Sequence, residues 1–171
     1  MGRHRGRKEE ALVKKQNVLA LDLASTTGWA TKTRRTDHIQ SGEICWVSKS
    51  KKVVYTKPRI CRFKGWLEYQ VSYWKIKKVV YEAPLPGAYG SALLIQMETV
   101  IILVCEERDI DYDSVNVGTL KKATTGDGRA SKAMMIAAVE VLFADHIKVL
   151  DEKITHNQAD ALAVLAWEMG Q

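Results

Sequence analysis

Apolar positions follow two different spacings along this chain, and the change between them marks the predicted elements. Residues 18–23 form a nearly continuous apolar run, which is typical of a central strand buried on both faces. A turn-forming cluster at 25–28 leads into strands predicted at 29–31 and 38–47, so the chain opens with a three-stranded antiparallel unit. Two more strands are predicted at 78–81, which runs into Glu82 before Pro84 ends the pairing, and at 112–117.

Helical spacing begins at residues 57–76, where apolar side chains recur three or four positions apart, as on the core-facing side of an amphipathic helix. Three more helices are predicted at 91–107, from a cap at Ser131 to about residue 143, and at 155–169. The packing face of the last helix consists of Ala161, Leu162, Leu165 and Ala166. The order is therefore three strands, helix, strand, helix, strand, helix, helix, with no internal repeat.

The helix predicted at 57–76 carries a second stripe of cations and aromatic rings. Its members are Arg59, Arg62, Trp66, Tyr69 and Tyr73. The cations could contact phosphates while the rings stack on unpaired bases. The same mixture is common at protein interfaces, and it also suits an ordinary amphipathic surface. The sequence leaves these three interpretations open.

Composition bounds the class of protein. At 171 residues and 46% hydrophobic content, the chain suits one domain with a real core, which we place at residues 17–171. Residues 1–16 have little apolar content and are predicted to form a disordered basic arm, which either tracks a DNA backbone or is inert. Three widely spaced cysteines suggest neither disulfides nor a zinc site. No apolar stretch reaches the roughly 20 residues of a membrane span and no signal peptide is visible, so we expect a cytoplasmic protein.

Charge is unevenly distributed along the chain. The formal net charge is +6, and residues 48–78 carry ten Lys and Arg against a single Glu. Residues 79–171 carry seven basic against fourteen acidic side chains. If this segregation survives folding, one face attracts phosphate and the acidic remainder contains any metal ligands, although the lysines could instead lie on ordinary solvated surface.

Three carboxylates occur where the apolar pattern makes them unfavourable. Asp22 interrupts the first strand, Glu82 ends the fourth, and Asp160 stands among the core-facing alanines of the last helix. A buried ionised carboxylate costs several kcal/mol unless something compensates it, as a cation does. Mg²⁺ prefers carboxylate oxygen and water, and a pair of such ions can clamp the attacking and leaving oxygens of a phosphodiester. No Ser/His/Asp or Cys/His hydrolase arrangement competes with this metal hypothesis.

Each of these acids also has a structural interpretation of its own. Asp22 could hydrogen-bond the turn that follows it, Glu82 could pair with a lysine, and Asp160 could interact favourably with the start of its helix. Their joint occurrence in strand one, strand four and the last helix is harder to explain in structural terms.

Four motifs carry a family resemblance: LDLASTTGWA, VVYEAP, LKKATTGDGRASKAMMI and HNQADALAVLAWE. In this order the chain resembles the RuvC-type Holliday junction resolvases, particularly their phage-borne branch, within the ribonuclease H-like superfamily. The resemblance covers residues 17–168 and implies an α/β, ribonuclease H-like fold, in which helices flank a mixed five-stranded sheet of three antiparallel strands followed by parallel ones. It further implies that Asp22, Glu82 and Asp160 bind Mg²⁺, with Mn²⁺ as a substitute, and that a homodimer cuts two strands of a four-way junction.

The chain departs from this family at two positions. Ala24 stands where the family often has glycine, which affects only turn geometry. The family's fourth ligand, an Asp or His three residues before the last acid, is Asn157 here. Asn157 could bind as a neutral ligand, His156 could take the role as ligand or proton-transfer group, or the change could be inactivating. The sequence does not choose among these alternatives.

Basic residues near the helix capped by Ser131 complete the candidate site. The segment at 124–132 combines two glycines and hydroxyls with Arg129 and Lys132 ahead of a helix start, where backbone N–H groups favour phosphate. Taken alone, it is a turn followed by a capped helix. Within the resemblance, Lys121, Lys122 and Lys132 are expected to approach the scissile backbone and stabilise developing charge.

The leading hypothesis is therefore a metal-dependent crossover junction endodeoxyribonuclease that acts on branched DNA as a homodimer, with no small-molecule cofactor. It would work in the cytoplasm, that of a bacterial host if the protein is phage-encoded. Two alternatives remain: a broader nuclease for flaps, forks and other branches, and a junction-binding protein with weakened catalysis.

Overall fold

A five-stranded mixed sheet forms the centre of the molecule in the computed structural model, which describes residues 16–34, 39–46, 58–85, 92–150 and 153–170. The strands lie in the order β3-β2-β1-β4-β5. Their bounds are β1 Val18–Asp22, β2 Thr26–Lys32, β3 Ile39–Cys45, β4 Lys78–Glu82 and β5 Asp111–Val115. The first three pair antiparallel, whereas β4 pairs parallel with both β1 and β5. The predicted mixed sheet is confirmed.

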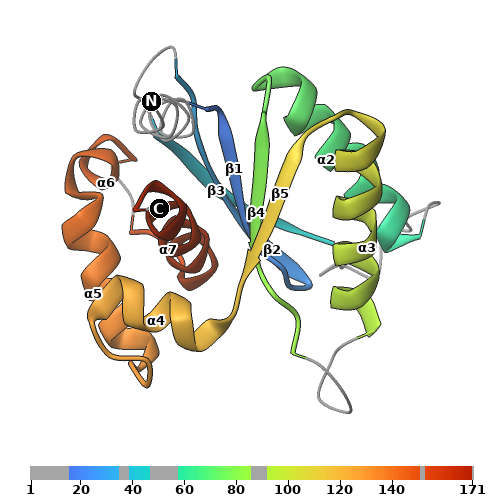
Figure 1. Cartoon of the computed structure of the whole chain (residues 1–171). Helices are drawn as coiled ribbons and strands as arrows, with labels where there is room; N and C mark the ends of the chain where they lie inside the picture. The colour runs from blue at the N-terminus through green and yellow to red at the C-terminus, as the bar shows by residue number, and fades with distance from the viewer. Residues whose placement is uncertain (1–15, 35–38, 47–57, 86–91, 151–152, 171) are drawn as a thin grey trace, which may run out of the picture.

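Helices cover both faces of this sheet (Figure 1). One face carries α2 (Arg59–Tyr73) and α3 (Ala92–Glu107). The other carries α4 (Val117–Thr125), α5 (Lys132–Leu142), α6 (Ala144–Leu150) and α7 (His156–Met169). Successive side chains of a strand point to opposite faces, so β1 contributes to both cores. Ala20 packs in the α5 and α7 core, whereas Leu19 and Leu21 pack in the α2 and α3 core.

The last helix, α7, lies between the sheet and α4 to α6 (Figure 1). Its residues 161–165 are all buried, because this helix contacts β1 and β2 on one side and α5 on the other. A capping box fixes its start: the Thr155 hydroxyl accepts from the Gln158 N–H, and the Gln158 side chain accepts from the Thr155 N–H. Near its end, Glu168 pairs with Lys78 at 2.8 Å. The capping box therefore defines where α7 begins, and the ion pair joins its last turn to β4.

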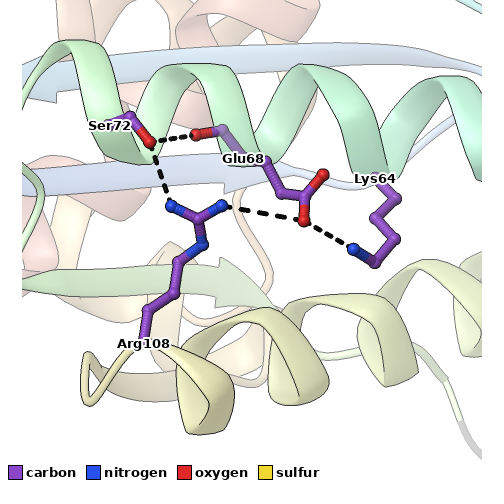
Figure 2. A network of polar contacts seen from close by, with 4 residues as sticks. All are labelled: Lys64, Glu68, Ser72 and Arg108. Carbon is purple, nitrogen blue, oxygen red and sulfur yellow. Dashed lines mark hydrogen bonds and ion pairs between the residues drawn. The ribbon is translucent and has the colours of Figure 1, made fainter.

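A polar network joins the two helices on the opposite face (Figure 2). Arg108, at the end of α3, donates to the hydroxyl of Ser72 at 3.0 Å and lies 3.7 Å from the carboxylate of Glu68. Lys64 donates to the same carboxylate at 2.5 Å. These side chains are partly exposed, so the network orients α2 against α3 and adds little stability.

The structure differs from the sequence-based prediction at several element boundaries. It adds two short helices, α4 and α6, which were not predicted, because stretches of nine and seven residues show too few turns for a periodic pattern. The strand predicted at 112–117 ends at Val115, since Asn116 caps α4. β2 begins at Thr26, inside the predicted turn. The predicted basic arm lies outside the described residues, apart from Gln16.

None of the helices in the described part of the chain is both long and apolar enough to cross a membrane.

Candidate active site

Four residues, one on each of β4, β1, β2 and β3, lie in a row across one end of the sheet. β1 and β4 run parallel with Leu21 opposite Tyr81, so the next residues, Asp22 and Glu82, lie side by side at the carboxyl ends of these strands. On the other side of β1, Asp22 pairs with Gly28 of β2, and Gly28 in turn pairs with Glu43 of β3. Residues aligned across a sheet point to the same face. Asp22 lies two residues after Ala20 on β1, so both side chains point to the same face of the sheet. Ala20 packs in the core that α7 covers, and the side chains of this row therefore point toward α7.

The start of α7 lies directly over this row. Gly28 allows the close approach: a Cβ atom built there would lie 1.8 Å from the carbonyl oxygen of Asn157. Asn157 and Asp160 are three residues apart on α7 and therefore share a helix face. The missing side chain of Gly28 thus lets α7 bring these two residues to the acids of the sheet.

These residues line one cleft of about 750 Å³. Seven of the side chains that the sequence predicted meet in it: Asp22, Glu82, Lys121, Lys132, His156, Asn157 and Asp160. The remaining lining residues are Ala24, Ser25, Thr26, Glu43, Val117, Leu120, Met135 and Thr155. The lining residues come from β1, β2, β3, β4, α4, α5 and α7, so the composition of the cleft depends on the fold as a whole.

Three of the four acids that line the cleft hold their protons more tightly than free carboxyl groups do. Burial, with repulsion from Asp160 and Glu82, raises the pKa of Asp22 from 3.8 to about 7. Burial and the charge of Asp160 also raise the pKa of Glu82. Burial raises the pKa of Asp160, against the opposing charges of Lys132, His156 and Lys121. The cleft therefore concentrates negative charge that the protein compensates only in part.

A hard divalent cation matches this donor chemistry. Carboxylate oxygens are the ligands that Mg²⁺ and Mn²⁺ prefer. A cation would stabilise the ionised carboxylates against the burial that raises all three pKa values and the repulsion that also raises those of Asp22 and Glu82. In the described part of the chain, no three His, Cys, Asp or Glu side chains approach closely enough to form a ligand group as they stand. Like charges repel, so the three carboxylates have no reason to converge without a cation between them. The residues fit the group in chemistry, and all three acids line the same cleft.

Other residues that the sequence singled out lie away from the cleft lining. Lys122 and Arg129 are exposed side chains outside it. Arg59, Arg62 and Trp66 belong to α2, on the face of the sheet opposite α7 (Figure 1). Arg62 donates to the carbonyl oxygen of Trp46, and Trp66 packs against Trp46 and Phe63. A DNA-binding role for these five residues stays a prediction, and on α2 it would require DNA beyond the cleft.

Two residues of the site were missed by sequence reasoning. Glu43 is one polar residue in a half-polar strand, and Gly28 stood inside the predicted turn. Only the pairing register of β1, β2 and β3 aligns them with Asp22. A sequence signal did exist for Gly28, because glycine inside a strand often marks a close approach of another backbone.

The sheet order and the two helical layers define a ribonuclease H-like fold. Among solved structures, the chain is similar to RuvC from Thermus thermophilus, at 15% identity and a TM-score of 0.62 over 88% of this chain and 91% of that one. It is also similar to T. thermophilus RuvC in complex with a Holliday junction substrate, at 16% identity and a TM-score of 0.67 with the same coverage. The yeast mitochondrial Holliday junction resolvase Ydc2 matches at 12% identity and 0.62, over 96% of this chain and 85% of that one.

No protein-family model and no curated protein matches the sequence. The predicted resemblance to RuvC-type resolvases is confirmed at the level of the fold. The phage-borne branch stays a prediction.

Proposed function

We propose that this protein is a divalent-metal-dependent endonuclease that cuts branched DNA and resolves Holliday junctions. The observation that carries the proposal is the meeting of Asp22, Glu82 and Asp160 with Lys121 and Lys132 in one cleft. Acids placed to hold a cation beside lysines placed to hold a phosphate suit metal-assisted hydrolysis of a phosphodiester. The solved structures that share the fold include a Holliday junction resolvase and RuvC in complex with a Holliday junction substrate, which supports this choice of substrate.

Asp22, Glu82 and Asp160 would hold the cation, which would neutralise charge on the phosphate and lower the pKa of a bound water. Lys121 and Lys132 position a phosphate at the same cleft, and their charges act on the cleft acids from α4 and α5. His156 is exposed and lines the cleft, where it is placed to act as a ligand or a proton-transfer group. Phosphate contacts of this kind position DNA without reading its bases, so shape governs selection.

A four-way junction must be cut on two strands, and the described part of one chain carries one such cleft. We therefore propose a homodimer with one site for each strand. Sedimentation velocity on the purified protein, with and without a synthetic junction, measures this state directly. A complex that stays at one protein chain per junction would contradict paired cutting.

Cleavage of a synthetic four-way junction tests the proposed activity. Purified protein with Mg²⁺ or Mn²⁺ is expected to convert the junction into symmetric nicked duplexes, and to leave a linear duplex of the same sequence intact. Chelation by EDTA should stop the reaction. Cleavage that continues at the same rate in EDTA would contradict a metal-dependent enzyme.

The same preparation separates the alternatives. Equal rates on flaps, forks and four-way junctions would favour a broader structure-selective nuclease. Tight junction binding without cutting in Mg²⁺ or Mn²⁺ would favour a binding protein with weakened catalysis, the outcome that Asn157 raises.

We expect Lys132 to affect the titration of the cleft acids and the cleavage rate more than the stability of the fold. Its positive charge lowers the pKa of Asp22, Glu82 and Asp160. Lys132→Met should therefore shift the carboxyl titrations to higher pH and move the acidic limb of the cleavage profile the same way. Loss of a phosphate-stabilising cation should also lower the cleavage rate by about 10²-fold.

Carboxyl ¹³C chemical shifts, followed by NMR against pH, measure the first effect, and junction cleavage measures the second. Lys148→Met is the matched control, because Lys148 lies on α6 with 78% of its side chain exposed. Identical titrations in the two variants would contradict the electrostatic role of Lys132.

A further inference from the structure

Glu43 reaches the start of α7 from the row of residues that crosses the sheet. It lies opposite Gly28 on β3, so its side chain points to the α7 face. One of its carboxylate oxygens, Oε2, accepts a hydrogen bond from the Thr155 hydroxyl at 2.8 Å and another from Nδ2 of Asn157 at 3.0 Å. Glu43, Thr155 and Asn157 all line the cleft. The contacts are exposed to solvent, so their main effect is on orientation.

The chemistry of this contact decides which way the Asn157 amide faces. An ionised carboxylate only accepts hydrogen bonds, whereas an amide has a donating nitrogen and an accepting oxygen. The nitrogen must therefore be the atom that faces Glu43. The amide carbonyl oxygen, Oδ1, is then the atom that Asn157 has available for a ligand in the cleft.

We propose that Glu43 is a positioning residue that holds Asn157 by its amide nitrogen, so that Oδ1 serves as a neutral oxygen donor beside Asp22, Glu82 and Asp160. This inference rests on the proposed function, because it assumes that a divalent cation binds between those three acids. Groups that orient a metal ligand from outside its coordination sphere contribute strongly to metal affinity. Glu43 would do so for Asn157.

The pair also accounts for the neutral residue on α7. An Asp at position 157 would place a second carboxylate against Glu43, with no proton donor between the two acceptors. With Asn157, the cleft keeps four acids in its lining and gains an amide of fixed orientation. In this chain, asparagine is therefore the residue that suits its neighbour on β3.

A double-mutant cycle on Mn²⁺ affinity tests the positioning role without relying on cleavage. Four proteins are compared by calorimetry with Mn²⁺ alone: the wild type, Glu43→Ala, Asn157→Ala and the double variant. Glu43→Ala should weaken Mn²⁺ binding by about 10-fold, as should Asn157→Ala. In the Asn157→Ala background, Glu43→Ala should have no further effect beyond about 2-fold, because the residue it orients is already gone.

Equal losses from Glu43→Ala in both backgrounds would show that Glu43 acts through its own charge, and would overturn the positioning role. Unchanged affinity in Glu43→Ala would overturn it as well. A wild-type protein that binds no Mn²⁺ would overturn the proposed metal-dependent function and this inference with it. Because the wild type is measured first, the two failures are distinguishable.

Thermal unfolding without metal gives a second test that does not require the alanine variants to fold. Asn157→Asp should lower the unfolding midpoint by about 2–4 °C in the presence of Glu43, since two carboxylates then face each other. Combined with Glu43→Gln, which supplies an amide donor, the same change should be nearly neutral. An equal fall of the unfolding midpoint in both backgrounds would show that the Asn157 amide does not donate to Glu43, and would overturn the proposal.

Discussion

Asp22→Asn is expected to abolish junction cleavage and, at the same time, to stabilise the metal-free protein. Burial and two neighbouring acids raise the pKa of Asp22 from 3.8 to about 7. Between these values the folded state holds a proton that the unfolded chain releases, so this group makes stability fall as pH rises from about 4 to 7. Asparagine cannot ionise, and above pH 7 its substitution should recover on the order of 3 kcal/mol.

The expected rise in the thermal midpoint at pH 8, in EDTA, is roughly 6–12 °C. Near pH 4 the difference should largely vanish, because Asp22 is then protonated in the folded state. Cleavage in Mg²⁺ should fall by about 10³-fold or more, since a ligand of the cation is lost. Scanning calorimetry at both pH values and a junction assay measure the two effects.

Asp145→Asn is a suitable control for this experiment, because Asp145 lies fully exposed on α6, 3.9 Å from Lys148. It should change neither the midpoint nor the cleavage rate appreciably. A lower midpoint for Asp22→Asn at pH 8 would contradict the electrostatic account. Cleavage that persists in the variant would contradict the proposed site.

Gly28→Ala should be among the most destabilising single-methyl changes in the chain. The added Cβ would lie 1.8 Å from the carbonyl oxygen of Asn157 and 2.4 Å from its carbonyl carbon, and both are backbone atoms that cannot move alone. The start of α7 must therefore shift away from the sheet, which we expect to cost about 3 kcal/mol or more. Asp160 lies on the same helix, so Mn²⁺ affinity should fall as well.

Gly65→Ala provides a matched control with the opposite sign. Gly65 lies inside α2. In the part of the chain that the structure describes, no atom other than those of its neighbours and its own helix backbone lies within 4 Å of the position that a Cβ would take. Alanine favours a helix over glycine by about 0.5–1 kcal/mol, so this variant should be more stable than the wild type. Urea unfolding of both variants makes the comparison. Equal stability of Gly28→Ala and Gly65→Ala would show that α7 does not depend on close packing against β2.

The two central strands, β1 and β4, could be predicted because they are short apolar runs with definite ends. The run at β1, the strand that ends at Glu82 and the Ser131 cap of α5 all lie where the pattern placed them. Short helices escaped prediction, since α4 and α6 depend on packing and a cap at Asn116 rather than on a repeated spacing. The aromatic members of the cationic and aromatic stripe predicted on α2 have different surroundings in the structure. Tyr69 and Tyr73 stack on each other at the surface, whereas Trp66 packs inward against Phe63.

By itself, the sequence determined which acids stand at positions where the surrounding pattern is apolar. A carboxylate in an apolar strand or on a buried helix face is unfavourable wherever the chain goes, so Asp22, Glu82 and Asp160 could be recognised without a structure. Only the tertiary structure decided what surrounds them. The register of three strands aligned Glu43 and Gly28 with Asp22, and the packing of α7 over Gly28 brought Asn157 to Glu43. The contacts of Thr155 and Asn157 with Glu43 join residues more than a hundred positions apart. Strand pairing and helix packing determine them, and no local pattern does.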